Sequence, residues 1–257
     1  MELPLFPLHT VLCPGIALPL HIFEDRYRAL VKRCLEESSP FGIVLIREGR
    51  EVGGGTISFS AVGTIAEIRQ AGHYPDGRYD ILVVGTNRFS IERVAVGDEG
   101  YFIAQVTPLP EVVADEELAN RLSNRATRRF VRYLELLQPR SGETADEIDV
   151  RVEVETEDPS ALEPRPPDQG GDEPESLLAD EGAERRIVIP DDPTTLSHLL
   201  AGIIQVELPR RQALLEAATT EARLRELLSL IDREVLLLRR RWRAFVPGPA
   251  GLGPRRS

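Results

Sequence analysis

The sequence from Val62 to Val84 reads VGTIAEIRQAGHYPDGRYDILVV, and this stretch decides the fold. Its two ends, Val62–Gln70 and Tyr79–Val84, are rich in the β-branched and aliphatic residues of strands. Between them, Pro75 presets φ for a turn and Gly77 accepts the positive φ that the turn needs. The stretch therefore predicts two strands joined by a tight turn.

Further short apolar segments surround this pair at intervals of roughly 10–15 residues. They are Leu3–Leu8, Ile16–Leu20, Ile43–Arg47, Phe89–Val94 and Tyr101–Val106. Prolines in the first two place them at edges or bends of a sheet, and Pro14-Gly15 and Gly85 are predicted to set turns. Many short strands in succession favour a barrel or closed sheet over strand–helix–strand units.

One helix interrupts the strands. Its apolar stripe falls at helical spacing on Tyr27, Leu30, Val31, Cys34 and Leu35. Glu24 and Asp25 favour its N-terminus through the helix dipole, and the helix is expected to end at Ser38-Ser39-Pro40.

After residue 115 the apolar period becomes helical. A first helix follows Leu118, Leu122, Ala126, Phe130 and Leu134, and three more begin at Asp192-Pro193, Leu208-Pro209 and about Thr220. Four helices with matched apolar faces imply a small bundle. The sequence thus predicts an α+β protein, with a β-rich domain and one helix over residues 1–112 and a four-helix bundle from residues 113–140 and 187–246.

Charge is concentrated in one stretch. The chain carries a net charge of −11, while residues 141–184 hold 16 acidic side chains and two arginines, a net −14. Five prolines and few large apolar residues lie in that stretch, so residues 141–186 are interpreted as a disordered acidic insert. A regulatory or partner-binding segment and a solvated linker both fit it, and Ile148–Val154 alternates like a short strand. Residues 247–257 are expected to form a flexible tail.

Several activities are disfavoured by composition. The 31 basic residues include a single lysine, Lys32, which has no glycine beside it. A Walker A loop is therefore excluded, and a Ser-Lys dyad or a Schiff base would have only that lysine to use. No apolar run is long enough to cross a bilayer, and the N-terminus lacks a secretion signal, so a cytoplasmic protein is expected.

Candidate metal and nucleophile sites are weak. His9, Cys13, His21 and Cys34 lack the short paired spacings of zinc modules. Buried thiols are the favoured interpretation, and a Cys13–Cys34 disulfide is the alternative. His73 and His198 have no evident triad partner, and Gly53-Gly54-Gly55 is read as a hairpin loop. We therefore expect no catalytic residue, no metal and no cofactor.

A family resemblance rests on a series of motifs. They are Leu3-Pro4-Leu5-Phe6-Pro7-Leu8, Val11-Leu12-Cys13-Pro14-Gly15, Leu18-Pro19-Leu20-His21-Ile22-Phe23-Glu24-Asp25-Arg26-Tyr27, Pro75-Asp76-Gly77-Arg78, Val83-Val84-Gly85-Thr86-Asn87-Arg88-Phe89 and Leu208-Pro209-Arg210-Arg211-Gln212-Ala213-Leu214-Leu215-Glu216. In this order they resemble the N-terminal domain of Lon proteases, in its stand-alone bacterial form. The resemblance implies a PUA-like pseudo-barrel followed by a helical bundle, without the ATPase and peptidase modules.

The same resemblance implies that the chain recognises unfolded or degron-bearing polypeptides in protein quality control without being an enzyme. Candidate groove residues for exposed apolar or extended segments are Phe6, Pro19, Phe23, Arg26, Tyr27, Arg88 and Phe89. Two alternatives stay open, an RNA-binding PUA-like domain and an assembly adaptor that uses the bundle and the acidic insert. The near-balanced charge outside the insert argues against nucleic acid, because the arginine clusters at 125–132 and 239–243 fit solvated helix faces.

Overall fold

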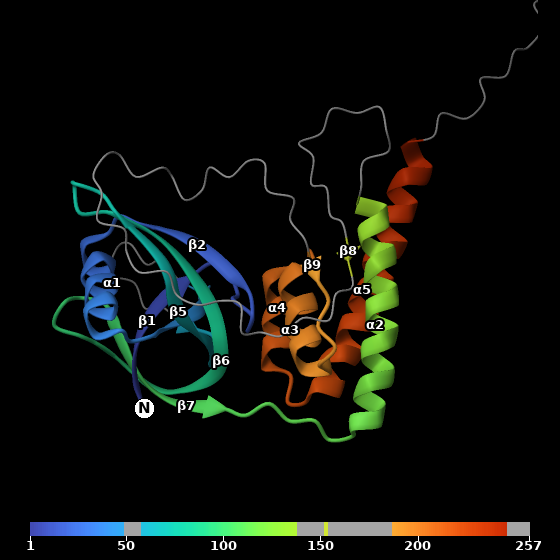
Figure 1. Cartoon of the computed structure of the whole chain (residues 1–257), viewed down its shortest axis with the longest axis horizontal. Coiled ribbons are helices and arrows are strands. Elements are labelled where there is room, and N and C mark those ends of the chain that lie inside the picture. The colour runs from blue at the N-terminus through green and yellow to red at the C-terminus, as the bar shows by residue number, and fades with distance from the viewer. Residues whose placement is uncertain (49–57, 138–151, 154–186, 246–257) are drawn as a thin grey trace, which may run out of the picture.

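The computed structural model describes residues 1–48, 58–137, 152–153 and 187–245, and places a β-rich half beside a helical half (Figure 1). The β-rich half contains β1 (Glu2–Leu8), β2 (Ala17–Ile22), α1 (Asp25–Glu37), β3 (Phe41–Glu48), β4 (Ser58–Phe59), β5 (Val62–His73), β6 (Tyr79–Val96) and β7 (Phe102–Leu109). The helical half contains α2 (Glu116–Leu137), β8 (Val152–Glu153), β9 (Ile187–Val188), α3 (Pro193–Ile203), α4 (Leu208–Glu216) and α5 (Thr220–Phe245). The predicted α+β class is confirmed.

Some predictions fall outside these residues. Apart from β8, which pairs in parallel with β9, the acidic insert lies outside the described residues. The tail at 247–257 and Gly53-Gly54-Gly55 lie outside them too.

Strand pairing in the β-rich half closes into a ring. β1 pairs antiparallel with β7 and parallel with β3. β7 also pairs with β6, β6 with β5, and β5 with β3, so these five strands form a closed ring. β2 adds to the outside of this ring on β6, and β4 adds on β3. Ring closure removes most of the open edges that a sheet would otherwise expose.

The two prolines of β1 lie where they break no ladder bond. Met1 and Val106 exchange both backbone hydrogen bonds, and this sets the alternation of β1, so that odd residues face β7 and even residues face β3. Pro4 therefore faces the β3 side, where pairing begins only at Leu5. Pro7 faces the β7 side, where pairing has ended at Leu5. Each missing N–H thus points to a side without a partner strand.

One apolar cluster fills the inside of the ring and another lies on its outside. The interior is filled by Phe89 with residues of the other strands, Leu3, Leu5, Val44, Ile65, Ala104 and Val106. Gly42 and Gly63 leave room for it, since a Cβ on either would come within 2.7 Å of Phe89 Cζ. The outer cluster lies under α1, which buries Tyr27, Leu30, Val31 and Cys34.

Three local predictions were wrong. Leu35 closes the predicted stripe of α1 but is 40% exposed, since it lies at the margin of the buried face. Phe89–Val94 is not a separate strand, because β6 runs unbroken from Tyr79 to Val96. Gly85 lies within β6 instead of a turn, and a Cβ there would come within 2.6 Å of the Cys13 carbonyl oxygen.

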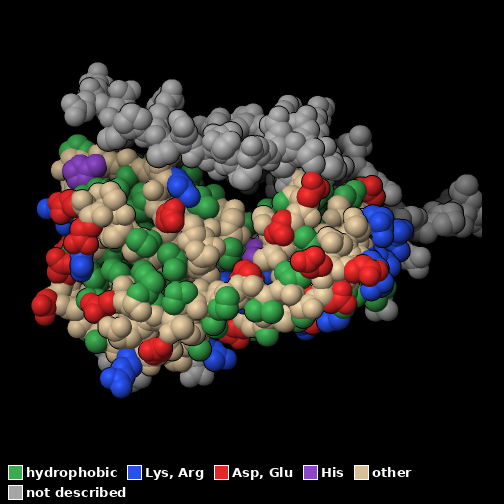
Figure 2. Space-filling view, turned by 60° about the horizontal axis from the view of Figure 1, so that its bottom comes forward, with side chains coloured by type: hydrophobic (Ala, Val, Ile, Leu, Met, Phe, Trp, Pro, Cys, Tyr) green, Lys and Arg blue, Asp and Glu red, His purple; other side chains and the backbone are tan. Residues whose placement is uncertain are grey.

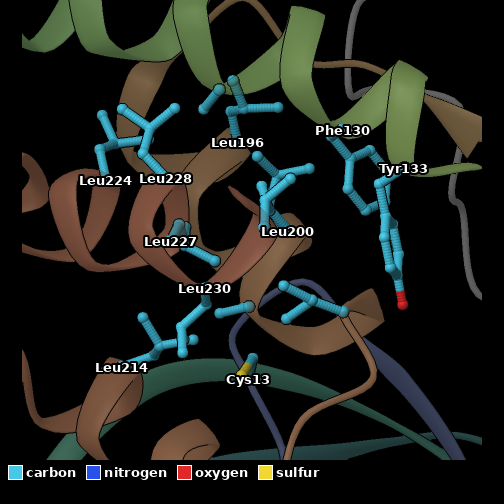
Figure 3. Packing of buried hydrophobic residues seen from close by; sticks show 14 of the residues in the cluster. Cys13, Phe130, Tyr133, Leu196, Leu200, Leu214, Leu224, Leu227, Leu228 and Leu230 are labelled. Carbon is cyan, nitrogen blue, oxygen red and sulfur yellow. The ribbon is translucent and has the colours of Figure 1, made fainter. Parts of the chain in front are cut away.

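The helical half forms its own core around leucines of α3, α4 and α5 and aromatic residues of α2 (Figure 3). Asp192 caps α3 as predicted, with its side chain accepting from Thr195 N at 2.7 Å and Pro193 following it. Four helices lie after residue 112 among the described residues, so the helical C-terminal part is confirmed. No described helix is both long and apolar enough to cross a bilayer.

Candidate polypeptide-binding surface

The outer edge of β2 is open among the described residues. The hydrogen bond from Gly85 N to Ile16 O sets the alternation of the β2–β6 ladder, so the backbone groups of Ala17, Pro19 and His21 point away from β6. Pro19 has no N–H to offer there. The edge can therefore accept a short extended segment beside Ala17 or His21, but not a continuous strand across Pro19.

A polar cluster fixes the end of this strand. His21 and Asp80 are direct partners in the ladder, and His21 Nδ1 lies 2.5 Å from Asp80 Oδ1. The hydroxyl of Tyr74 donates to Asp80 Oδ2 at 2.5 Å. Burial alone raises the pKa of Asp80, but the hydrogen bonds from Tyr74 and His21 outweigh it and hold that pKa below its ordinary value. Asp80 is thus an ionised, buried acceptor that orients two more exposed rings.

Aromatic groups surround this cluster. Phe23 is 62% exposed, and its ring stacks on that of His21 with 6.2 Å between centroids. The Tyr74 ring meets His21 edge-on at 6.3 Å, and the Arg78 guanidinium lies over Tyr74. We call Pro19, His21, Phe23 and Tyr74 the corner surface, because they lie where β2 ends before α1 and beside the β5–β6 hairpin.

The seven predicted groove residues do not form one groove. Pro19 and Phe23 are exposed, and Arg26 is partly exposed, paired with Glu24 and lying over the Tyr27 ring. Phe6 stacks on Tyr27 at 4.2 Å beneath α1, and both rings are buried. Phe89 fills the ring interior. The structure therefore brings Pro19 and Phe23 to one surface and places Phe6, Tyr27 and Phe89 in the core.

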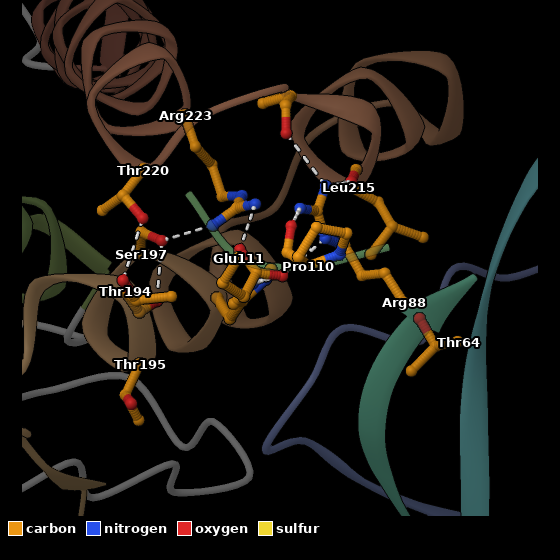
Figure 4. Close-up of polar contacts among 12 residues, drawn as sticks. Thr64, Arg88, Pro110, Glu111, Thr194, Thr195, Ser197, Leu215, Thr220 and Arg223 are labelled. Carbon is orange, nitrogen blue, oxygen red and sulfur yellow. Dashed lines mark hydrogen bonds and ion pairs between the residues drawn. The ribbon is translucent and has the colours of Figure 1, made fainter. Parts of the chain in front are cut away.

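Arg88, the seventh residue, lies between the two halves of the molecule (Figure 4). Its side chain is 3% exposed, and it donates to Glu111 Oε1 at 2.6 Å and to the carbonyls of Leu215 and Ala217 at the C-terminal end of α4. Its neighbour Arg223, fully buried on α5, donates to Glu111 Oε2, Ser197 Oγ and the Leu214 carbonyl. The two buried arginines and the partly exposed Glu111 form a junction that joins β6 to α3, α4 and α5.

The surroundings of the junction favour an ionised Glu111 and a neutral His198 at pH 7. Burial raises the pKa of Glu111, but His198, Arg223 and Arg88 outweigh it and lower that pKa to about 2. His198 Nε2 lies 3.0 Å from Glu111 Oε1 without meeting hydrogen-bond geometry. Burial lowers the pKa of His198, which is therefore neutral at pH 7. The Ser197 hydroxyl accepts from Arg223 and donates to the Thr194 carbonyl at 2.7 Å, so both of its hydrogen-bonding roles are used inside the protein. We interpret the junction as structural.

The cysteine and histidine candidates are dispersed. Cys13 reaches into the helical core near Leu214 and Leu230 (Figure 3), while Cys34 lies on the buried face of α1. Both thiols are free and buried, which confirms the buried-thiol interpretation and rules out the Cys13–Cys34 disulfide alternative. Burial raises the pKa of Cys13 to about 11, so its thiol is inert at neutral pH. Within the described ranges, no three potential metal ligands cluster.

A second apolar surface lies on the β-rich half. Val96 is 67% and Val94 38% exposed near the end of β6, and the half-buried Phe59 and Phe102 rings meet edge-on at 5.1 Å beside the interior cluster. Figure 2 shows hydrophobic side chains gathered on the β-rich half in that view.

Sequence reasoning missed Tyr74, Asp80, Glu111 and Arg223. For Asp80 a signal existed, because pairing Ile16–Leu20 with Tyr79–Val84 in antiparallel register would place His21 beside it. Glu111 and Arg223 are 112 residues apart in sequence, and no local pattern joins them.

The closed β-rich half with one covering helix, joined to a helical half, is the fold of Lon N-terminal domains. A Lon N-terminal domain protein from Xanthomonas campestris matches with a TM-score of 0.56 at 24% identity, covering 89% of this chain and 98% of that chain. The N-terminal domain of a Mycobacterium avium complex Lon protease matches with a TM-score of 0.57 at 20% identity, covering 90% of this chain and 98% of that one.

The sequence belongs to the family of ATP-dependent protease La (LON) substrate-binding domains, whose family model matches residues 2–233. Similar full-length relatives include the Lon protease of Cytophaga hutchinsonii, 25% identical over 92% of this chain, and Lon protease 2 of Myxococcus xanthus, 24% identical over 92%. The chain spans about a quarter of the length of these relatives, 24% in both cases.

Proposed function

We propose that this chain is a non-catalytic recognition module that binds exposed apolar or extended polypeptide segments through the corner surface. Membership in a substrate-binding domain family supports this class of ligand. The observation that carries the choice of surface is the exposed Phe23 ring, stacked on a histidine that Asp80 holds in place. Rigid aromatic anchors of this kind dominate binding energy in protein interfaces.

The chemistry of the corner surface suits a polypeptide. Phe23 and Pro19 supply apolar contact area, while the open edge at Ala17 and His21 supplies backbone donors and acceptors for a few residues of extended chain. Because Pro19 interrupts the edge, such a segment is short, and its affinity is expected in the micromolar range of transient recognition. A role as an adaptor in protein quality control is part of this proposal.

The test is fluorescence anisotropy with fluorescein-labelled unfolded peptides, one set rich in apolar residues and one polar. The apolar set should bind saturably, and Phe23→Ser should weaken binding about tenfold, which corresponds to about 1.4 kcal/mol. Val96→Ser is the matched control, because Val96 is an exposed apolar residue of the same half, 67% exposed. If Val96→Ser weakens binding and Phe23→Ser does not, the corner surface is not the site. If no peptide binds, the proposed function fails.

A further inference from the structure

The outward side of α2 carries a row of arginines. Arg121, Arg125, Arg128 and Arg132 are all exposed, and their spacing of four, three and four residues aligns them along one side of the helix. At about 1.5 Å of rise per residue the row is about 16 Å long. No acidic residue lies between its first and last members in the sequence. We call these four residues the arginine face.

Most of this positive charge lacks a counter-charge among the described residues. Arg121 pairs with Glu117 at 3.2 Å, and the neighbouring Arg129 pairs with Asp232 of α5 at 3.0 Å. In the part of the chain that the structure describes, Arg125, Arg128 and Arg132 make no ion pair or hydrogen bond. Like charges at these spacings cost a helix a few tenths of a kcal/mol per pair, about 0.2–0.5. An acidic ligand that covers the row would remove this cost.

The same chain supplies the most acidic ligand available. Residues 141–184 carry a net −14 and begin four residues after Leu137, the last residue of α2. The first acidic residue, Glu143, is six residues beyond Leu137, a reach of about 20 Å when extended. That reach covers the distance back along the helix to Arg125, which is about 18 Å.

Tethering raises the chance of this contact. β8 pairs with β9, so the described residues that flank 154–186 in the sequence, Glu153 and Ile187, lie on neighbouring strands. A short tether gives an effective concentration in the millimolar range, on the order of 1 mM or above. A separate polyanion that makes the same contacts would need a higher concentration than this to displace the tethered stretch.

We propose that the acidic stretch 141–184 binds the arginine face of α2 in the same molecule. Each exposed Arg–carboxylate pair contributes little, so several pairs must act together and the contact weakens as salt screens them. External polyanions, including nucleic acid, then bind this face only by displacing the stretch. The proposal is independent of the corner surface and of its ligand.

The test measures the distance between the two partners by energy transfer. One dye is placed at Asn124→Cys, an exposed position on α2. The other is placed at Gln169→Cys, a change that leaves the charge of the acidic stretch unaltered. Cys13 and Cys34 are buried and are not expected to be labelled. We expect high transfer efficiency at low salt and a clear fall in 0.5 M salt, where the Debye length is only a few Å, about 4 Å.

Two triple variants decide the outcome. Arg125→Ser, Arg128→Ser and Arg132→Ser together should lower transfer at low salt to the high-salt value. Arg47→Ser, Arg69→Ser and Arg93→Ser, exposed arginines of the β-rich half, change the net charge equally and should leave it high. Far-ultraviolet circular dichroism checks that both variants stay folded. Equal transfer efficiency in the two triple variants would overturn the proposal.

A second measurement uses heparin as the external polyanion. Replacing the acidic residues of 141–184 by their amides should tighten heparin binding at least tenfold, and adding the α2 triple substitution should remove that gain. Unchanged heparin affinity after the amide substitutions would also overturn the proposal.

Discussion

Arg88 Nε and Glu111 Oε1 lie 2.6 Å apart at the boundary between the β-rich and helical halves. The same guanidinium donates to the carbonyls of Leu215 in the last turn of α4 and of Ala217 just after it. One buried side chain of β6 therefore satisfies a carboxylate and two backbone acceptors of the helical half. Such a group fixes how the two halves sit together, because removing it leaves several buried polar atoms unpaired.

Arg88→Met should destabilise the chain strongly. Methionine keeps much of the side-chain volume but removes the donor to Glu111 Oε1 and to the carbonyls of Leu215 and Ala217, while Arg223 still donates to Glu111 Oε2. A buried acceptor left without a donor costs about 1–3 kcal/mol. Urea unfolding followed by circular dichroism measures this free energy. Arg93→Met, on the exposed part of the same strand, is the control and should change it by less than about 0.5 kcal/mol. Equal effects of the two substitutions would show that the junction contributes nothing.

Acid should destabilise the chain in two steps. His198 has its pKa lowered by burial, so the unfolded state takes up a proton near pH 6.5 before the folded state does, and stability falls below that pH. The pKa of Glu111 falls from 4.5 to about 2, so its contribution is present above pH 4.5 and is lost as the pH falls toward 2. Unfolding free energy measured from pH 8 to pH 3 tests both steps.

Variants assign each step. His198→Gln should flatten the upper part of the pH profile, and Glu111→Gln the lower part, each at a cost in overall stability. A wild-type free energy that stays constant from pH 8 to pH 4 would contradict this account of the junction.

Gly42→Ala and Gly63→Ala should each destabilise the ring, and Phe89→Leu should offset the loss of stability more for Gly42→Ala than for Gly63→Ala. The three heavy atoms nearest to a Cβ on Gly42 are all side-chain ends, Phe89 Cζ at 2.7 Å and the Cδ2 atoms of Leu3 and Leu5 at 2.9 Å. A Cβ on Gly63 would also meet the Ile43 carbonyl oxygen at 2.6 Å, which is backbone. Gly42→Ala and Gly63→Ala should each destabilise by about 1–3 kcal/mol.

Phe89→Leu separates the two cases. It shortens the side chain that both new methyl groups would meet, so it should offset part of the cost of Gly42→Ala in a double-mutant cycle. It cannot move the Ile43 carbonyl, so Gly63→Ala should gain less relief. Equal coupling energies in the two cycles would show that the backbone contact is not limiting.

What the sequence could predict was local. Pro75 and Gly77 carry their own turn chemistry, and Gly77 has φ of +86° as that turn requires. Asp192 and Pro193 likewise define the start of α3 by themselves. In contrast, the sequence predicts a turn at Gly85, because nothing in it shows that the Cys13 carbonyl passes against that residue.

The candidate site was harder to predict for the same reason. Phe6, Phe23, Tyr27 and Phe89 are aromatic residues in similar apolar contexts, and only the packing of α1 and the closure of the ring decide that Phe23 alone is exposed. Arg88 resembles a surface arginine in sequence, since the burial of a charged side chain depends on partners such as Glu111 that lie far along the chain.

Asp80 should act on polypeptide binding through His21. If Asp80 orients the His21 ring, Asp80→Asn and His21→Ala should each weaken binding of the apolar peptides about threefold to tenfold, which corresponds to about 0.7–1.4 kcal/mol. The double variant should bind no more weakly than the poorer single variant, because both changes remove one interaction. His73→Ala, an exposed histidine of the same hairpin that contacts Tyr79, is the control and should bind normally. Purely additive effects of Asp80→Asn and His21→Ala would mean that Asp80 does not act through His21, and unfolding measurements on each variant would separate a loss of binding from a loss of stability.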